Sequence, residues 1–242
     1  MLTPLISNYS LKDQKRIELH FTKLLPHLQK DQFIIVGGLA INYHLKKRGV
    51  KIPFRPFNDL DIMAKSPSVV LPSVIKDFLI YHYHKRKSSF FIALVDPESR
   101  TKIDIFDYSI TPEKTEEVLF GNYKLRIRGV EDQLIKTILD TLKVKEGVKI
   151  DPKQFIDARL LLKVADMSKA DRIWKVHSLT KIAPNIISAF QDAEKTAKIH
   201  PELLAKKPFR RKSPYRCKDC IDNPKFPITP MSRIYNILRY VE

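Results

Sequence analysis

Asn58-Asp59-Leu60-Asp61-Ile62 alternates acidic and apolar side chains along one short stretch of the chain. On a β-strand, successive side chains point to opposite faces of the sheet. Asp59 and Asp61 therefore project together from one face, while Leu60 and Ile62 anchor the other. The stretch predicts a strand with one carboxylate face, and the fold is expected to be organised around that face.

Two further segments extend this pattern on either side. The apolar run Phe33–Val36 predicts a buried strand, and the following Gly37 and Gly38 predict a tight turn into a helix. Lys102-Ile103-Asp104-Ile105-Phe106 alternates in the same way and predicts another strand, with Asp104 on one face. Three carboxylates from two strands, beside a glycine turn that lets phosphates approach backbone N–H groups, indicate a nucleotidyl-transfer site.

The predicted carboxylate set suits magnesium. Phosphoryl transfer needs charge neutralisation and in-line positioning, which two Mg²⁺ ions about 3.5–4 Å apart supply. Mg²⁺ binds a few carboxylates together with water and phosphate oxygens. We expect Asp59 and Asp61 to bridge the two ions, and Asp104 to bind the ion at the acceptor hydroxyl. Asp107 competes with Asp104, but it falls on the opposite face of a regular strand; a β-bulge would reverse this choice.

The rest of the chain predicts an α+β fold with helices flanking a mixed sheet. Ser10 with Asp13 predicts a capping box that opens the first helix, and another helix is expected over Val69–Tyr83, with Pro72 limiting it to a start near that residue. Further strands are expected over residues 90–95, 101–108 and 123–127. After Gly129, apolar residues repeat at helical spacing to about Lys198. Three parts are predicted: a catalytic α/β domain (1–128), a helical domain (129–204) and a basic, Pro-rich C-terminal extension with a terminal helix (205–242).

Composition limits the classes of partner. The 242 residues hold 44 Lys+Arg and 27 Asp+Glu, a net charge of +17. This surplus favours polyanionic partners, because neutralising phosphates releases counterions from nucleic acid; a surplus that serves only solubility is the alternative. No apolar run approaches the roughly 18 residues of a membrane span, and the first residues lack a secretory signal pattern. We therefore expect a cytoplasmic protein without a membrane partner.

The C-terminal extension has its own character. Residues 205–242 hold ten Lys or Arg against three acidic residues, with aromatic residues between the charges. This composition suits single-stranded RNA, whose bases stack on aromatic rings while cations follow the phosphates. A tail packed over the helical domain is equally compatible with it. Cys217 and Cys220 form a single CxxC, too few ligands for a structural zinc unless His200 lies near, so ordinary thiols or a reversible disulfide are expected.

The three motifs together resemble a known superfamily. Phe33-Ile-Ile-Val-Gly37-Gly38-Leu-Ala, Arg55-Pro-Phe-Asn-Asp59-Leu-Asp61-Ile and Ile103-Asp104-Ile105 resemble, in this order, the nucleotidyltransferase (polymerase-beta-like) superfamily. Within it the chain looks most like the AbiEii-type toxin branch, related to MenT toxins and to small antibiotic nucleotidyltransferases. The resemblance covers roughly residues 30–165. Two departures are a long segment between Gly38 and Asp59, and Leu39 where many relatives place Ser or Thr.

The resemblance implies a nucleotidyltransferase-like sheet and Mg²⁺-dependent transfer of NMP from an NTP to a hydroxyl acceptor. It further implies RNA as acceptor, in the first place a tRNA end, and a toxin with a cognate antitoxin. It also implies that Arg55 touches phosphate, that Lys136 binds the triphosphate, and that Asp157 positions it or pairs with a cation. From the residues alone, Lys136 and Asp157 could equally be surface residues. Transfer to a small antibiotic, and a catalytically silent RNA- or antitoxin-binding module, stay open as alternatives.

Overall fold

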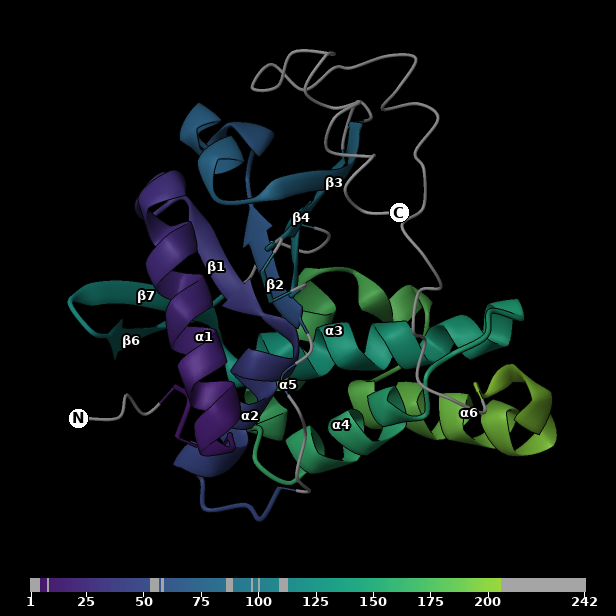
Figure 1. Ribbon diagram of the computed structural model, residues 1–242. Helices are drawn as coiled ribbons and strands as arrows, with labels where there is room; N and C mark the ends of the chain where they lie inside the picture. Colours follow the sequence, from purple (N-terminus) through teal and green to yellow (C-terminus); the bar gives the residue numbers. More distant parts are fainter. Residues whose placement is uncertain are drawn as a thin grey trace.

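A seven-stranded mixed sheet forms the centre of the protein, with strand order β3-β4-β5-β2-β1-β7-β6 (Figure 1). The computed structural model describes residues 5–7, 9–52, 57, 59–85, 89–96, 98–99, 101–108 and 113–205. The strands are β1 (Phe33–Val36), β2 (Asp59–Ala64), β3 (Leu79–Lys85), β4 (Phe90–Val95), β5 (Lys102–Asp107), β6 (Thr115–Phe120) and β7 (Tyr123–Arg128). The pairs β2–β5 and β1–β7 are parallel, and the other neighbouring pairs are antiparallel.

One helix lies along the sheet, and most of the others form a separate group beside it. The α-helices of the described residues are α1 (Leu11–Leu24), α2 (Gly37–Lys47), α3 (Val130–Leu142), α4 (Lys153–Leu162), α5 (Met167–Val176) and α6 (Ile186–Ile199). Figure 1 shows α1 lying along the sheet and α3 to α6 grouped together, away from β3. Short 3₁₀ segments are η1 (Leu25–His27), η2 (Pro67–Val69), η3 (Pro72–Lys76), η4 (Lys143–Glu146), η5 (Leu179–Lys181) and η6 (Pro201–Leu203).

The larger core lies between α1 and the sheet. Ile17 and Phe21 of α1 belong to one buried cluster with the strand residues Ile35, Ile62 and Ile105. Burying these side chains stabilises the fold by roughly 1.5–3 kcal/mol each. Because side chains alternate along a strand, the residues that flank these isoleucines face the other side of the sheet. Asp59, Asp61 and Asp104 are therefore turned away from α1.

The second core lies in the helical part and includes residues from one face of α2. Trp174 of α5 is fully buried there, and its Nε1–H donates to the Ala183 carbonyl at 3.0 Å. Ile41 and Leu45 of α2 pack in this second core, whereas Leu39 of the same helix packs in the first. Helix α2 therefore packs against both the predicted catalytic part and the predicted helical part. The two parts are separate in sequence, on either side of Gly129, but they are in contact through this helix.

The predicted fold class is confirmed, since a mixed sheet is flanked by helices and helices follow from Val130 onward. The predicted cap of the first helix is also confirmed: the Ser10 hydroxyl accepts a hydrogen bond from the Asp13 backbone N–H at 3.1 Å. The strands predicted at residues 90–95 and 101–108 are β4 and β5, which pair antiparallel, and the strand predicted at residues 123–127 is β7. The edge strand β6 carried no prediction, because its Thr-Glu-Glu start lacks a clear apolar alternation.

The helix predicted over Val69–Tyr83 is wrong. This region holds the 3₁₀ segments η2 and η3 followed by strand β3. Pro67 and Pro72 each start a short 3₁₀ turn and cannot donate the backbone hydrogen bonds of a continuing α-helix. From Leu79 onward, aromatic and β-branched residues favour a strand, and pairing with β4 supplies the backbone hydrogen bonds.

Two further predictions concern the ends of the fold. The predicted C-terminal extension lies outside the described residues from residue 206 onward, and so do the terminal helix predicted there, Cys217 and Cys220. Across the part of the chain that the structure describes, no helix has the length and apolar content that a membrane crossing requires.

Candidate functional site

The register of the sheet brings the three predicted carboxylates onto adjacent strands. In the parallel β2–β5 pair, Asp61 is the register partner of Asp104, and Asp59 is the partner of Lys102. Register partners on neighbouring strands point to the same face, so Asp59, Asp61, Lys102 and Asp104 share one face. The pairing runs without a shift to Asp107, so β5 has no bulge and Asp107 faces the opposite side.

The glycine turn lies against this carboxylate face. Val36 is the register partner of Asp61, which places Gly37 at the end of β1 beside the acid. Gly37 has φ +64°, and a Cβ built on it would lie 2.0 Å from Asp61 Oδ2. Both the left-handed backbone and the contact with Asp61 require glycine at this position. The turn is therefore built around the Asp61 carboxylate.

Helix α2 starts at this turn, so its first backbone N–H groups lie there. Its N-cap is Val36, which supplies no side-chain hydrogen bond to the first turn. The first N–H groups of a helix lack intrahelical acceptors and bind anions, phosphates in particular. A Cβ on Gly38 would lie 3.9 Å from Lys153 Nζ, so a lysine at the start of α4 faces the same turn. The Gly37–Gly38 turn thus brings the amino-terminal amides of α2 close to a cation.

Electrostatics single out Asp61 among the three acids. The residue is partly exposed, but protein atoms crowd its carboxylate, and this burial is the largest of the causes that together raise the pKa of Asp61 to about 7. Within that rise, the neighbouring carboxylates of Asp59 and Asp104 act in the same direction as burial, while Lys102 and Lys153 oppose the shift. Like charges held together in this way favour a proton or an added cation between them. The face is therefore prepared to bind positive charge.

In the structure, one cation already occupies part of this face. Lys102 Nζ donates a hydrogen bond to Asp104 Oδ2, an ion pair between residues two positions apart on β5. Among the described residues, no group of three or more His, Cys, Asp or Glu side chains is arranged to hold a metal ion. The chemistry of the donor set fits a divalent cation, but Lys102 must leave Asp104 before the three acids can share one.

The other predicted nucleotide-binding residues are placed less directly. Lys136 on α3 pairs with Asp140 one turn later, with 2.5 Å between Nζ and Oδ2. Asp157 is buried on α4, four residues after Lys153 and hence on the same side of that helix. Arg55 lies outside the described residues. The roles of Lys136, Asp157 and Arg55 in nucleotide binding stay predictions.

Two lysines of this site were missed from the sequence. Lys102 precedes Asp104 by two strand positions, so the alternation that selected Asp104 also places Lys102 on the carboxylate face. Lys153 carried no comparable signal, because it reaches the glycine turn only through the packing of α4 against α2.

Comparisons with known proteins complete the description. No family model matches the chain, and no curated protein matches it. Among solved structures, an antigenic nucleotidyltransferase-like protein from Paracoccidioides brasiliensis is 14% identical, with a TM-score of 0.37, covering 76% of this chain and 94% of its own. JHP933 from Helicobacter pylori is 12% identical, with a TM-score of 0.35, covering 81% of this chain and 94% of its own. With TM-scores this low, neither likeness carries weight for the activity of this chain.

Proposed function

We propose that this protein is a metal-dependent nucleotidyltransferase, which moves NMP from an NTP onto a hydroxyl acceptor and releases pyrophosphate. One observation carries the proposal: the Asp61 carboxylate lies between its register partner Asp104 and the Gly37 turn, within the field of Asp59. A cation site and a phosphate site are thereby joined at one point. Nucleotidyl transfer requires this combination, because the metal must reach both the triphosphate and the acceptor hydroxyl.

Each residue of the site has a defined task in this proposal. Asp59 and Asp61 would hold two Mg²⁺ ions, with Asp104 holding the ion on the acceptor side. The bound ions supply charge neutralisation at the phosphates and lower the pKa of the acceptor hydroxyl. The first N–H groups of α2 and the Lys153 ammonium bind the triphosphate oxygens. Lys102 releases Asp104 and compensates the negative charge of the face when the site is empty.

The acceptor in this proposal is RNA, in the first place a tRNA end, and the protein acts as the toxin of a toxin–antitoxin pair. The net charge of +17 supports a polyanionic acceptor. The motif resemblance to AbiEii- and MenT-type toxins supports the tRNA end and the antitoxin partner. A cationic antibiotic would favour an acidic pocket, which the charge balance opposes.

A second candidate function rests on the Lys102–Asp104 ion pair. If this pair persists with nucleotide present, the third metal ligand is blocked and the protein is a catalytically silent RNA- or antitoxin-binding module on the same fold. The two candidates differ in one measurable property, covalent transfer of label from NTP.

The test incubates the full chain with Mg²⁺ and each α-³²P-labelled NTP in turn, with total RNA, purified tRNA or hydroxyl-bearing antibiotics as acceptors. The Asp59→Asn/Asp61→Asn double variant serves as the inactive enzyme. Asp107→Asn is the matched control, because it removes a carboxylate from the other face of β5. Circular dichroism verifies that each variant is folded.

Label on tRNA that needs Asp59 and Asp61 but not Asp107 supports the proposal. Label on an antibiotic and not on RNA would show that the acceptor is a small molecule. Binding of RNA with no label from any NTP identifies the silent module. Transfer that survives in the double variant refutes the assigned site.

A further inference from the structure

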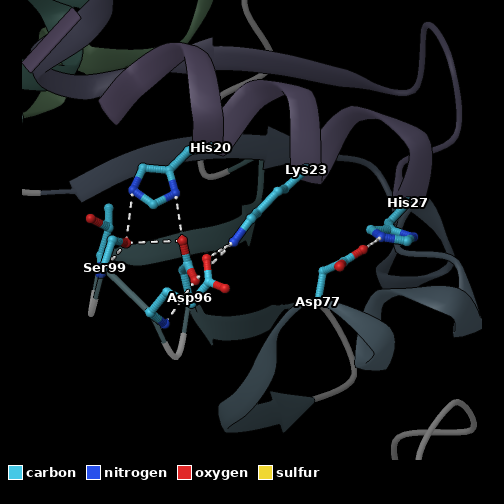
Figure 2. Close-up of polar contacts among 8 residues, drawn as sticks. His20, Lys23, His27, Asp77, Asp96 and Ser99 are labelled. Atoms are coloured by element: carbon cyan, nitrogen blue, oxygen red, sulfur yellow. Dashed lines mark hydrogen bonds and ion pairs between the residues drawn. The ribbon is translucent and has the colours of Figure 1, made fainter. Parts of the chain in front are cut away.

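A row of polar side chains runs along α1 toward the sheet edge where β2 and β5 begin. Arg16, His20 and Lys23 follow one another at spacings of four and three residues, so they share one side of the helix. Figure 2 shows His20 and Lys23 pointing from α1 to Asp96 and Ser99 in the turn between β4 and β5. These contacts connect a helix outside the site to the strands that carry its carboxylates.

The Arg16 side chain donates hydrogen bonds to residues that precede two different strands, β2 and β5. Its Nη1 donates to the Phe57 carbonyl at 3.0 Å, and its Nη2 donates to Thr101 Oγ1 at 2.9 Å. Phe57 lies two residues before Asp59, and Thr101 comes directly before Lys102. Asp59 and Lys102 are register partners, so the guanidinium spans the parallel strands just before their acidic segments.

The guanidinium and its first acceptor are themselves held in place. Arg16 Nη1 lies 3.2 Å from Asp13 Oδ1, and the guanidinium carbon lies 5.7 Å from the centre of the Phe57 ring. Phe57 is buried, and its ring also packs edge-on against Tyr9 and at a tilt of 37° against His20. Since the backbone after Phe57 enters β2, these contacts fix the start of that strand relative to α1.

The second acceptor is fixed by the turn before β5. Thr101 is buried, and its carbonyl accepts a hydrogen bond from the Asp96 N–H at 3.0 Å. The Asp96 carboxylate accepts from the Ser99 hydroxyl at 2.9 Å, and His20 Nε2 lies 3.1 Å from the same hydroxyl. Thr101 is therefore tied to α1 through both Arg16 and the turn.

We propose that Arg16 is a positioning residue, which sets the offset between the starts of β2 and β5 and thereby the separation of Asp59 from Asp104. This inference rests on the proposed function for its catalytic consequence. Arginine suits the task because its planar fork presents donors in two directions, whereas a lysine ammonium cannot reach both acceptors in the same geometry. Displacements of about 1 Å at a reacting centre cost on the order of 100-fold in rate.

The first test compares Arg16→Lys with Arg159→Lys, which alters an exposed arginine paired with Glu194 on the helical part. Amide hydrogen exchange is measured on both full-length variants and on the wild type. We expect Arg16→Lys to speed exchange about tenfold in residues 59–61 and 101–104, with β6 and β7 unchanged. We expect kcat to fall about tenfold and KM for the NTP to stay within twofold, since substrate contacts remain.

A second variant separates the two strands. Thr101→Val removes one acceptor of Arg16 and leaves the Phe57 carbonyl in place, so faster exchange is expected in residues 101–104 but not in 59–61. Unchanged exchange at both strand starts, or a uniform acceleration over the whole sheet, overturns the positioning role. Because exchange needs no substrate, a wild type without transferase activity refutes the proposed function while the exchange data still decide on Arg16.

Discussion

Asp61 and Asp96 are acids of the same sheet region with opposite surroundings. Asp96 has a fully buried side chain, and it accepts hydrogen bonds from the Glu98 backbone N–H at 3.0 Å and the Ser99 hydroxyl at 2.9 Å. Burial raises the pKa of Asp96, but these hydrogen bonds and the nearby Lys23 outweigh it and leave that pKa below its usual value. Figure 2 shows this carboxylate enclosed by its partners.

Asp61 has the reverse environment. The charged groups that act on its carboxylate include the acids Asp59 and Asp104. Its pKa rises to about 7 through burial and then through those two acids. A carboxylate that accepts hydrogen bonds from protein donors stabilises the fold, whereas a carboxylate held beside other acids is a candidate for ligand binding.

The largest expected effect tests the ligand side of this comparison. We predict that Asp61→Asn lowers the rate of NMP transfer at least 1000-fold, about 4 kcal/mol of transition-state stabilisation, because the residue would bind both metal ions. Asp96→Asn should lower the rate less than tenfold at a temperature where it is folded. Initial rates of label transfer measure both, and a similar loss in the two variants contradicts the distinction.

The next effect tests the structural side. Asp96→Ala removes the carboxylate that lies 3.2 Å from His20 Nδ1 and 3.6 Å from Lys23 Nζ and that accepts hydrogen bonds within the 96–101 turn, so we predict a loss of about 3 kcal/mol in the free energy of unfolding. Asp192→Ala is the control, since it removes an exposed carboxylate paired with Lys145 and should cost less than about 1 kcal/mol. Urea unfolding measures both values. Equal costs would show that the buried network contributes no more than a surface ion pair.

The pH dependence of stability should have opposite signs for the two acids. The unfolded chain releases the Asp61 proton near pH 4 and the folded protein near pH 7, so the folded state holds more protons in this window and stability falls as pH rises. Asp96 has a lowered pKa, so its stabilisation is present above the unfolded value and is lost in more acidic solution.

We therefore predict that the wild type without Mg²⁺ loses about 2 kcal/mol of its free energy of unfolding through Asp61 between pH 5 and pH 8, and that Asp61→Asn does not show this loss. Guanidinium unfolding at a series of pH values measures the difference. An identical pH profile in Asp61→Asn and wild type would show that Asp61 titrates alike in the folded and unfolded states.

The smallest effect concerns the cation at the glycine turn. Lys153→Met should raise KM for the NTP about tenfold, a change of about 1.4 kcal/mol, with kcat nearly unchanged if the ammonium binds phosphate in ground and transition states alike. Lys198→Met, on an exposed position of α6, is the control. Steady-state kinetics with saturating acceptor separates KM from kcat, and equal KM values for the two variants would remove Lys153 from the site.

Local patterns in the sequence were sufficient for the carboxylate face. Alternation along Asp59–Ile62 and around Asp104 assigned faces correctly because β2 and β5 are regular strands in matching register. The Ser10 cap was equally readable, since its hydrogen bond to Asp13 spans only three residues. The helix predicted at Val69–Tyr83 was wrong, because two prolines and the pairing of β3 with β4 determine the structure of this segment. The spacing of its apolar residues contains no information on either.

The sequence alone determined which residue types carry the chemistry and which side of each strand they take, because side-chain direction depends on local backbone geometry. Only the tertiary structure decided that Gly37 lies against Asp61, that Lys153 faces the glycine turn and that Arg16 spans two strand entrances. These contacts join residues separated by 24 to more than 100 positions in the chain. They depend on sheet register and helix packing, which arise from the whole core and from no single segment.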